Sequence, residues 1–521
     1  MKNLLLYTIY LLISIAVCLP LTNADVNIDC SWFVDSVNGD PANTLCTSTA
    51  PCKTIFSAFS ALSNTDGVKC NDTIDRYIYI ASGTYKGAGN APLFINFPYL
   101  PNQNSGFKVI VQAIDSIPAS ITTLPLSNGT LATVVDADGK SSLFLISFIA
   151  TSRLVFIGLT FQNGVQQSGS AAIDSPMIIG SQMNEVMFIN CKFLNNKSMR
   201  YGALSWGPLG GGRFENCQFT NNQAVTGHGG AIHMNNMNSR TDIINSKFLG
   251  NKAVKGGALY ASLSNLVIQS TTFSNSTASA DGGALFLESM TRVIGEEYWT
   301  DLTFQYNFAA RGGAIYDIGC VLSYQTSTFL NNSASTNGGA ITFENSVSAV
   351  NLGKFNGNTA PLGGAVYVFD PKPNDLPLVI KMTNFTDNIA SQMGGAMYCD
   401  SATATLNSSN IYTNNRALTN QSSSTDYCTS TCLTTTKTCA CFSGCGLPPV
   451  PVKVITDKRE TKIAIGIFLP VTAVLLGIVG FLLWKTNEKK KLQKPQNLSY
   501  DEIRLNSPNY EKQVDDQDQN L

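Results

Sequence analysis

Charged residues are scarce in this chain of 521 residues. They make up 13% of it, about half the fraction of an average soluble domain. Basic and acidic residues nearly balance, 34 against 35, so the basic excess typical of nucleic-acid-binding proteins is missing. Two histidines in the whole chain argue against histidine-rich zinc sites. The polar surface must therefore come from Asn, Ser, Thr and Gly, which fits a cytosolic globular enzyme poorly.

The first 24 residues have the features of a secretory signal peptide. Lys2 supplies a positive charge, and Leu4 to Val17 are almost entirely apolar. Thr22 and Ala24 offer small residues before a cleavage site. The alternative is an uncleaved anchor, but a helix needs about 20 apolar residues to span a bilayer. We therefore expect residues 1–24 to be removed.

A second apolar segment, Ile463 to Trp484, has 22 residues without a charge. This length suits a transmembrane helix. Lysines follow from Lys485 onward and favour a cytoplasmic location for that side. The preceding flank is also basic, so the signal peptide decides the orientation. The sequence predicts a single-pass type I protein of the plasma membrane, with an extracellular ectodomain.

Cysteines and glycosylation sequons agree with secretion. Cysteines cluster at both ends of the ectodomain, from Cys30 to Cys70 and from Cys428 to Cys445, which predicts disulfides. Thirteen remain after loss of Cys18, so at least one thiol is free or pairs with another chain. Eight sequons on the outer side predict N-glycosylation at Asn71, Asn128, Asn196, Asn275, Asn331, Asn384, Asn407 and Asn420.

The central region contains a repeat. A Gly-Gly-Ala-aliphatic string recurs from Gly229 to Met397, with a degenerate copy at Tyr201 to Leu204, and its alanines are 25 to 31 residues apart. An aromatic-x-x-Asn-x-small string runs in phase with it from Phe193 to Tyr412. Two markers locked in phase over eight or nine copies indicate a repeat architecture.

The repeat sequence favours strands. Its segments are short, β-branched or aromatic, and interrupted by Gly, Asn and Ser, unlike helical repeats. A coil of about 27 residues can contain three short strands and three turns, which predicts a parallel β-helix. Stacking would place Phe193 and its equivalents in an inward ladder, and the asparagines three residues later in a turn ladder. Cys191 and Cys217 would lie in adjacent coils, as a disulfide or as buried thiols.

The two strings resemble the repeats of chlamydial-type polymorphic outer-membrane proteins, within the pectin-lyase-like right-handed β-helix superfamily. Asp35 to Asp40, Pro51 to Ile55 and Ala81 to Tyr85 are similar to the N-terminal cap and first coil of that superfamily. Phe156 to Gly164 resembles another coil. The resemblance covers about residues 30–420 and implies an all-β, right-handed parallel β-helix. Its members include sugar-cleaving enzymes, adhesins and proteins without known activity.

The predicted organisation has six parts. They are a signal peptide (1–24), a disulfide-containing cap (25–72), the β-helix (73–418), a Cys/Ser/Thr-rich stalk with a Pro linker (419–462), a transmembrane helix (463–484) and a disordered cytoplasmic tail (485–521). In the tail, Tyr500 and Ile503 match the tyrosine-x-x-bulky pattern of endocytic sorting signals. The alternative is a solvated tail without a signal.

An outer face of the repeats is the candidate binding site. The residue after each repeat alanine is aliphatic or Met and should point inward, so positions +2 and +4 should point outward. Position +2 is mostly aromatic and position +4 is often acidic. Rings stack on sugars, and carboxylates accept hydrogen bonds from hydroxyls or hold calcium. The candidates are Tyr260, Phe286, Tyr316, Tyr367, Tyr398, Glu288, Asp317 and Glu344. The alternative is a purely structural ladder of stacked rings.

Signals of catalysis are weak. His228, in Gly-His-Gly-Gly, resembles a catalytic string of the galacturonases but occupies a turn position without paired aspartates. Glu288 and Asp317, one coil apart, approach the ~5 Å carboxylate spacing of a retaining glycosidase. We expect a non-catalytic cell-surface glycoprotein that recognises carbohydrate or another surface protein, with no cofactor other than a possible calcium ion. The alternative is a membrane-tethered polysaccharide hydrolase or lyase.

Overall fold

The computed structural model describes residues 30–70, 74–97, 108–114, 132–165, 177–179, 183–206, 211–237, 239–290, 299–370, 378–400, 402, 404–406, 409–418 and 427–429. The chain divides into two compact units, Met1–Cys445 and Gly446–Leu521, and every described residue belongs to the first. The predicted signal peptide, transmembrane helix and tail, with Tyr500 and Ile503, lie outside the described residues. Among the residues that are described, no helix is long and apolar enough to cross a membrane.

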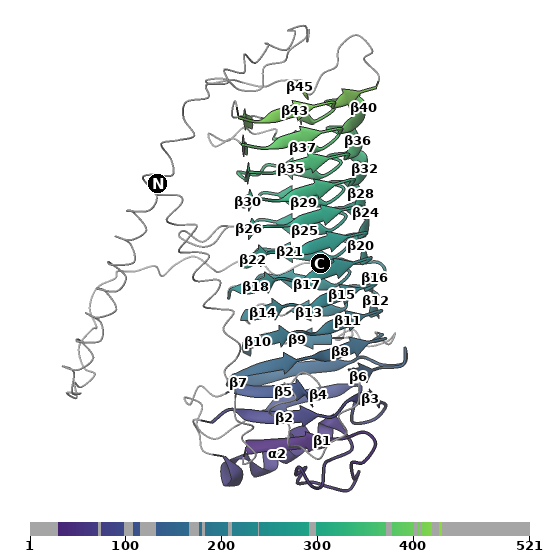
Figure 1. Cartoon of the computed structure of the whole chain (residues 1–521), viewed down its shortest axis with the longest axis vertical. Coiled ribbons are helices and arrows are strands. Elements are labelled where there is room, and N and C mark those ends of the chain that lie inside the picture. Colours follow the sequence, from purple (N-terminus) through teal and green to yellow (C-terminus); the bar gives the residue numbers. More distant parts are fainter. Residues whose placement is uncertain are drawn as a thin grey trace, which may run out of the picture. The chain divides into compact units, whose positions relative to one another are not determined.

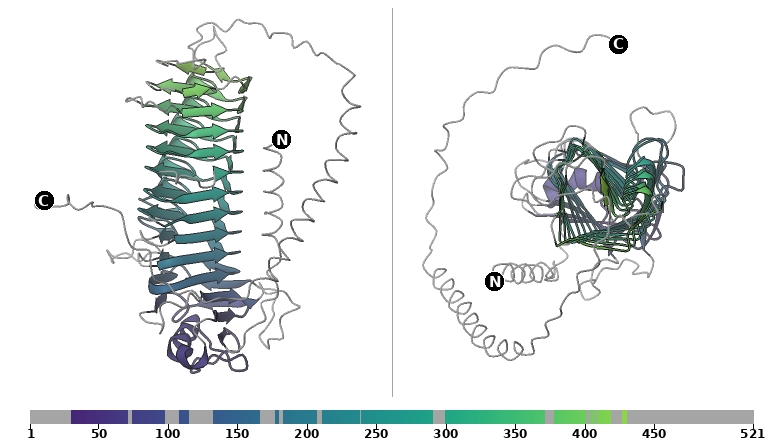
Figure 2. Two further views of the ribbon diagram at one scale, coloured as in Figure 1. Left: turned by 90° about the vertical axis from the view of Figure 1, so that its left-hand side faces the viewer. Right: turned by 90° about the horizontal axis from the view of Figure 1, so that it is seen from above.

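The described part is a stack of parallel coils, each with up to four short strands (Figure 1). The coils superimpose when they are viewed along the stack (Figure 2). We name the four stacks of paired strands ribbons A1, A2, B and C, in chain order within a regular coil. Such a parallel β-helix of the all-β class is the architecture that the sequence predicted.

Ribbons A1 and A2 together form one 24-stranded sheet. Ribbon A1 consists of β4 (Leu93–Phe97), the first half of β7 (Phe144–Ile157), β9 (Met177–Ile179), β13 (Leu204–Trp206), β17 (Ile232–Asn235), β21 (Leu259–Ser262), β25 (Leu285–Glu288), β29 (Ile315–Ile318), β33 (Ile341–Glu344), β37 (Val366–Phe369), β41 (Met397–Asp400) and β45 (Tyr427–Thr429). Ribbon A2 consists of β1 (Ser31–Val34), β2 (Arg76–Ile80), β5 (Lys108–Ala113), the second half of β7, β10 (Met183–Ile189), β14 (Gly211–Glu215), β18 (Thr241–Ile244), β22 (Leu266–Gln269), β26 (Trp299–Thr300), β30 (Ser323–Gln325), β34 (Ala349–Asn351), β38 (Leu378–Lys381) and β42 (Ala404–Leu406).

Ribbons B and C have twelve and nine strands, so nine coils carry a strand in ribbon C. Ribbon B consists of β3 (Gly83–Lys86), β6 (Thr133–Asp136), β8 (Leu159–Gln162), β11 (Lys192–Leu194), β15 (Gln218–Thr220), β19 (Lys247–Leu249), β23 (Thr272–Ser274), β27 (Thr303–Gln305), β31 (Thr328–Leu330), β35 (Lys354–Asn356), β39 (Asn384–Thr386) and β43 (Ile411–Thr413). Ribbon C consists of β12 (Lys197–Ser198), β16 (Gln223–Ala224), β20 (Lys252–Lys255), β24 (Thr277–Asp281), β28 (Phe308–Arg311), β32 (Ser333–Asn337), β36 (Thr359–Leu362), β40 (Ile389–Met393) and β44 (Arg416–Ala417).

A regular coil thus has four strands and four corners, where the sequence predicted three. The fourth corner separates A1 from A2 and carries a residue with positive φ, such as Ser289 (φ 51°) or Asn345 (φ 50°). In contrast, β7 runs through both ribbons as one strand of 14 residues. The sequence signal for this extra corner is weak. It is a single small or polar residue in several coils, such as Asn236, Ser289, Gly319 and Asn345, but Leu263 in another.

The interior follows the predicted ladders. Phe329 is fully buried, and its ring stacks on Phe304 and Phe355 with centroids 5.0 and 4.5 Å apart. In the asparagine ladder, Asn222 Nδ2 donates 3.0 Å bonds to Asn251 Oδ1 and to the carbonyl of Phe193. Each amide thereby satisfies a backbone group of one coil and a side chain of the next. Both ladders are confirmed.

The glycine pair lies at the corner that joins ribbon C to ribbon A1. The first glycine has positive φ, for example +60° at Gly338. A Cβ on the second glycine, Gly339, would lie 2.0 Å from the carbonyl oxygen of Gly364 in the next coil. No side chain fits there, because consecutive coils approach one another through their backbones.

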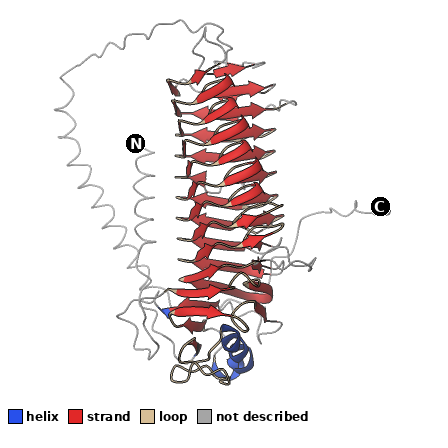
Figure 3. Cartoon of the chain, turned by 90° about the vertical axis from the view of Figure 1, so that its right-hand side faces the viewer, coloured by secondary structure: helices blue, strands red, loops and turns tan. Residues whose placement is uncertain are grey.

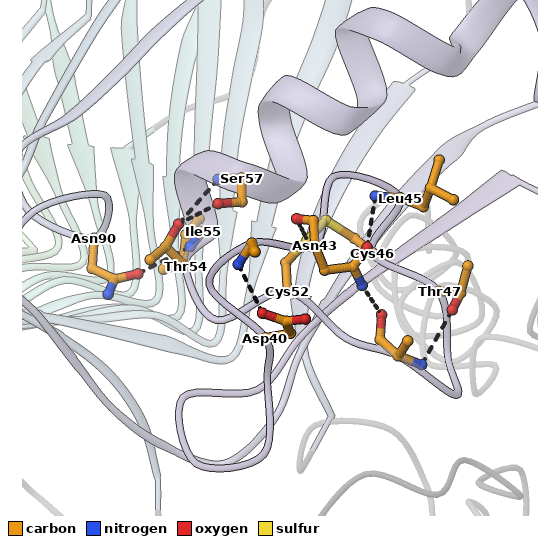
Figure 4. The surroundings of a disulfide bond; sticks show 12 residues. Asp40, Asn43, Leu45, Cys46, Thr47, Cys52, Thr54, Ile55, Ser57 and Asn90 are labelled. Carbon is orange, nitrogen blue, oxygen red and sulfur yellow. Dashed lines mark hydrogen bonds between the residues drawn. A yellow bond between two sulfur atoms is a disulfide. The ribbon is translucent and has the colours of Figure 1, made fainter.

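The N-terminal cap closes one end of the stack. Its helix α2 (Ile55–Lys69) lies beneath the first coils (Figure 3), and Thr54 begins it by accepting a 3.2 Å bond from the amide of Ser57. Two disulfides, Cys30–Cys70 and Cys46–Cys52, hold the cap together. Beside the second one (Figure 4), Asn90 Oδ1 accepts a 2.9 Å bond from the amide of Ile55 and ties the helix to β3 and β4. The disulfides that the sequence predicted in the cysteine cluster from Cys30 to Cys70 are therefore present.

Cysteines 191 and 217 are free, buried thiols in adjacent coils. Each donates its S–H to backbone carbonyls, Cys217 to Phe188 at 3.2 Å and Cys191 to Phe156 at 3.4 Å. Burial raises the pKa of Cys191 to about 12, against weaker opposing hydrogen bonds. Of the two alternatives that the sequence left open, the structure therefore has the buried thiols.

Candidate binding surface

The +2 side chains form a stacked column on the outer side of ribbon A1. His233, Tyr260, Phe286 and Tyr316 stack with successive centroid distances of 5.0, 5.1 and 5.4 Å. Thr342 interrupts the column, which resumes at Tyr367 and Tyr398, 5.8 Å apart. The residues on either side of the +2 positions, such as Leu285 and Leu287, point into the interior and are mostly part of the hydrophobic core. The predicted alternation is therefore correct for this column.

The expected exposure of these rings is wrong. Phe286 and Tyr316 are each only 2% exposed, and Tyr367 and Tyr398 are also buried; Tyr260 is half-buried. Two effects cover them. Each ring shields its neighbours in the stack, and cations at the end of ribbon C lie over them. Lys255 Nζ lies 4.5 Å from the Phe286 centroid, and Arg311 lies 4.6 Å from that of Tyr316.

Asp317 is on the wrong face for the predicted site. It occupies position +3, which points inward, and its side chain is fully buried. Its carboxylate accepts bonds of 2.9, 2.8 and 2.9 Å from Tyr324, Ser346 and Ser348. Burial raises the pKa of Asp317 although these hydrogen bonds oppose the shift. The proposed Asp317–Glu288 pair therefore lies on opposite faces of the sheet and cannot act as two glycosidase carboxylates.

The outer acids form pairs with the tyrosines. Tyr260 donates a 2.9 Å hydrogen bond to Glu288. Tyr316 likewise donates to Glu344, and Tyr367 to Asp400 at 2.9 Å. In every pair the tyrosine belongs to one coil and the acid to the next. The pattern thus repeats every two coils, or ~10 Å along the stack at ~4.8 Å per coil.

The sequence listed most of these side chains as candidates but missed their pairing and omitted Asp400. The available signal was the alternation of coils. The paired tyrosines are at position +2, in strands β21, β29 and β37. The paired acids are at position +4 of the coil that follows each of them, in strands β25, β33 and β41. Burial, followed by the bond to Glu288, raises the pKa of Tyr260 to about 12. Burial and the paired acids raise the pKa of Tyr316 and Tyr367 in the same direction.

Basic side chains from ribbon C border the column. Arg311 forms a two-pronged ion pair with Asp281, at 2.7 and 3.0 Å, and lies 3.7 Å from Glu344. Asp281 is buried, whereas the Glu344 side chain is 22% exposed. The surface therefore offers partly exposed carboxylates, held in place by tyrosine hydroxyls and Arg311. We call Tyr260, Glu288, Tyr316, Glu344, Tyr367 and Asp400 the tyrosine–acid surface.

His228 lies at the N-terminal end of this surface. Its ring stacks 5.1 Å from Tyr260 at the corner before ribbon A1. Burial and then Lys255 lower its pKa, so the imidazole is neutral at physiological pH. Within the described residues, no group of three or more His, Cys, Asp or Glu side chains is arranged to hold a metal ion.

Four of the eight predicted glycosylation sites fall on described residues. Asn275, Asn331 and Asn384 are exposed. Asn196 is buried in the asparagine ladder, where its Nδ2 donates to Asn222 at 3.0 Å and to Phe161 at 3.2 Å. A sugar would replace one of the two hydrogens on this nitrogen and so remove one of the bonds, and the fully buried position leaves no space for it. The prediction for Asn196 is therefore wrong in the folded chain. The remaining sites lie outside the described residues: Asn71, Asn128, Asn407 and Asn420.

Comparison with known proteins agrees with this architecture. Residues 216–235 and 326–344 match the Chlamydia polymorphic membrane protein repeat. Each match runs from the A2–B corner through ribbons B and C to the end of the strand in ribbon A1, which is a coil without its A2 strand. The chain is therefore a parallel β-helix in which two coils match this repeat, as the resemblance in the sequence predicted.

A curated relative covers a smaller part of the chain. A segment of 162 residues, 30% of the chain, is 29% identical to the metabotropic glutamate receptor-like protein R of Dictyostelium discoideum. The match spans only 10% of that relative's length.

Among solved structures, similar folds occur in glycoside hydrolases. The catalytic domain of a GH87 alpha-1,3-glucanase in complex with nigerose has a TM-score of 0.33 and 11% identity, over 72% of this chain and 66% of that one. The GH136 lacto-N-biosidase of Eubacterium ramulus has a TM-score of 0.31 and 10% identity, over 73% and 67%.

Proposed function

We propose that the protein is a non-catalytic, single-pass type I glycoprotein of the cell surface, and that its tyrosine–acid surface recognises carbohydrate or another surface molecule. The observation that carries this proposal is the two-coil repeat of partly exposed carboxylates, each fixed by a tyrosine hydroxyl. The repeat family and the receptor-like relative support a surface location.

The chemistry of the surface suits an extended, hydroxyl-rich ligand. Ionised carboxylates are acceptors, and sugar hydroxyls are donors that they bind strongly. Acceptors repeated every ~10 Å along the stack favour a linear chain that runs parallel to it. The buried rings of Phe286 and Tyr316 hold this array rigid and do not themselves stack on sugar. Rigid acceptors lose little entropy on binding.

A glycan array probed with the labelled ectodomain tests recognition. We expect wild-type protein to bind, and the Glu288→Gln/Glu344→Gln variant to lose at least about tenfold in affinity, which corresponds to 1.4 kcal/mol. Glu215→Gln is a matched control, because Glu215 is a similarly exposed acid of ribbon A2 that pairs with Arg213. A wild-type ectodomain that binds neither glycans nor cells would contradict the proposal.

Topology is tested separately on intact cells. Protease added outside should remove the repeats and leave a small fragment that contains residues 463–521. Protection of the repeats would overturn the type I orientation. Treatment with an N-glycosidase should also lower the apparent mass of the ectodomain.

One observation favours a second candidate, a membrane-tethered polysaccharide hydrolase. Glu288 and Glu344 are two coils, or ~10 Å, apart, close to the upper end of the carboxylate separation in inverting glycosidases, about 6.5–9.5 Å. A reducing-sugar assay on the glycans bound by the array distinguishes the two. Release that is lost in Glu288→Gln would establish hydrolysis, whereas binding without release supports recognition.

A further inference from the structure

The corner between ribbons B and C contains one residue that neither packing nor backbone preference explains. Every coil places a residue with positive φ there, and nearly all of them are Asn, Asp or Gly: Asn195, Asn221, Gly250, Asn275, Tyr306, Asn331, Gly357, Asp387 and Asn414. Tyr306 (φ 56°) is the exception. A bulky residue is strained in this region, and the side chain is 52% exposed, so burial does not compensate the strain.

The surroundings of Tyr306 form an exposed apolar patch beside a glycosylation sequon. Phe308, two residues later on the outer side of ribbon C, is 44% exposed. Asn275 occupies the same corner one coil earlier, and its amide donates a 3.1 Å bond to the carbonyl of Gln305. Phe308 is in register with Thr277, the third residue of the Asn275 sequon. The acceptor asparagine and the two rings are therefore one coil rise apart, ~4.8 Å.

The direction of the corner side chains decides which glycan would meet the rings. A Cβ built on Gly250 would lie 2.5 Å from Asn221 Oδ1, and one on Gly357 would lie 2.2 Å from Asn331 Oδ1. These corner asparagines thus lean over the corner residue of the following coil. For Asn275 the following corner residue is Tyr306, whereas for Asn331 it is a glycine without a side chain.

We propose that Tyr306 and Phe308 form a stacking platform for the first N-acetylglucosamine of an N-linked glycan on Asn275. In the attachment step, Nδ2 of Asn275 forms a bond to C1 of the sugar and loses a proton, and the lipid-diphosphate of the donor oligosaccharide leaves. The apolar face and the acetamido methyl of the sugar then cover the exposed rings. The strain at Tyr306 is retained because the glycan uses the ring.

This inference requires the secretory route but not the function proposed for the tyrosine–acid surface. The platform lies at the B–C corner, whereas that surface lies on ribbon A1. The three exposed described sequons are all on ribbon B or at its corner with ribbon C. Glycans there would leave ribbon A1 uncovered.

The test compares melting temperatures of the ectodomain with intact glycans and after complete removal by an N-glycosidase. Tyr306→Asn restores the usual corner residue and creates no sequon. In the glycan-free protein we expect it to raise the melting temperature by about 2 °C, because it relieves strain. In the glycosylated protein we expect the gain to vanish or reverse, because the platform is lost.

Three controls make the result specific. Leu352→Asn replaces another exposed residue with positive φ (58°) and should stabilise both forms equally. Thr277→Ala removes the sequon while it keeps Asn275. In this background, Tyr306→Asn should change the melting temperature by the same amount before and after treatment with the N-glycosidase. Trimming to a single N-acetylglucosamine should preserve the difference, since the first sugar makes the contact.

Two outcomes would overturn the proposal. One is an equal effect of Tyr306→Asn with and without glycans, which would make the tyrosine an unexplained surface residue. The other is a glycopeptide analysis by mass spectrometry that finds Asn275 unmodified. The same analysis should find Asn331 and Asn384 modified and Asn196 unmodified.

Discussion

Two aromatic columns run along this β-helix, and they differ in whether their side chains form hydrogen bonds. The inner column of ribbon B, with Phe329 at its centre, consists mainly of phenylalanines that are buried in the core and stack on one another. In the outer column of ribbon A1, Lys255 and Arg311 lie over two of the rings. Three of its tyrosine hydroxyls, those of Tyr260, Tyr316 and Tyr367, each bind an acid of the next coil. Both columns are therefore built from stacked rings contributed by successive coils. They differ because the tyrosines of the outer column have hydroxyl groups that bind acids, whereas the phenylalanines of the inner column have none.

The largest effect is expected in the inner column. Phe329→Ala should lower the free energy of unfolding by about 3–5 kcal/mol, because it opens a cavity between Phe304 and Phe355. Chemical denaturation of the ectodomain measures this loss. An unchanged midpoint of denaturation would mean that the inner column does not stabilise the fold.

The outer column should respond less and by a different mechanism. Tyr316→Phe keeps the stacked ring and removes only the hydroxyl that donates to Glu344. We expect a loss of about 1–3 kcal/mol, typical of a hydrogen bond to a charged group. Phe286→Tyr is a control in the same ribbon, because it keeps the stacked ring and leaves the hydrogen bond between Tyr316 and Glu344 in place. A loss as large as that of Phe329→Ala would erase the distinction between the columns.

A pH titration sharpens the comparison of inward and outward acids. The raised pKa of Asp317 means that the folded state holds its proton more tightly than the unfolded state does, whose value is 3.8. Stability should therefore fall as pH rises from about 4 through the folded pKa. Asp317→Asn should flatten this part of the profile. The opposite outcome is a wild-type protein whose stability rises with pH in this range, together with an Asp317→Asn variant that lacks the rise. That outcome would contradict the raised pKa of the buried carboxyl group.

The smallest effect is expected for Tyr260, the half-buried ring of the outer column. Tyr260→Ser should cost about 1 kcal/mol or slightly more. The ring has a stacked neighbour on each side but is partly exposed, so water can replace both part of its packing and its hydrogen bond to Glu288. Differential scanning calorimetry beside Phe329→Ala measures the contrast. If Tyr260→Ser lowers the free energy of unfolding by more than Tyr316→Phe does, the main role of Tyr260 is to stabilise the fold.

The sequence predicted the features that repeat in every coil. The phenylalanine ladder, the asparagine ladder and the glycine corner each have one residue type in a fixed frame, so their positions follow from periodicity. It missed a further ladder before ribbon B, where Ser246 and Thr271 hydroxyls accept bonds from the backbone amides of Cys217 and Ser246. Cys, Ser, Thr and Asn share that position, and this mixed composition hides its common role.

Features that depend on one side chain covering another were not predictable. The burial of Phe286 and Tyr316 comes from long cationic side chains of ribbon C, whose reach the alternation of a strand does not encode. Asp317 was assigned outward because neighbouring acids were, but it is one position out of step and is satisfied inside by Tyr324 and two serines. Asn196 fitted both the ladder and a sequon, and only burial separates these roles.

The central claim is that the tyrosines hold the outer acids in place for a ligand. The most direct test replaces Tyr260, Tyr316 and Tyr367 by Phe together, which retains every ring and every carboxylate. Binding of this ectodomain to the glycan array is then measured beside its melting curve. Our account predicts a folded protein that loses at least about tenfold in affinity, 1.4 kcal/mol. A folded triple variant that binds as tightly as the wild type would contradict it.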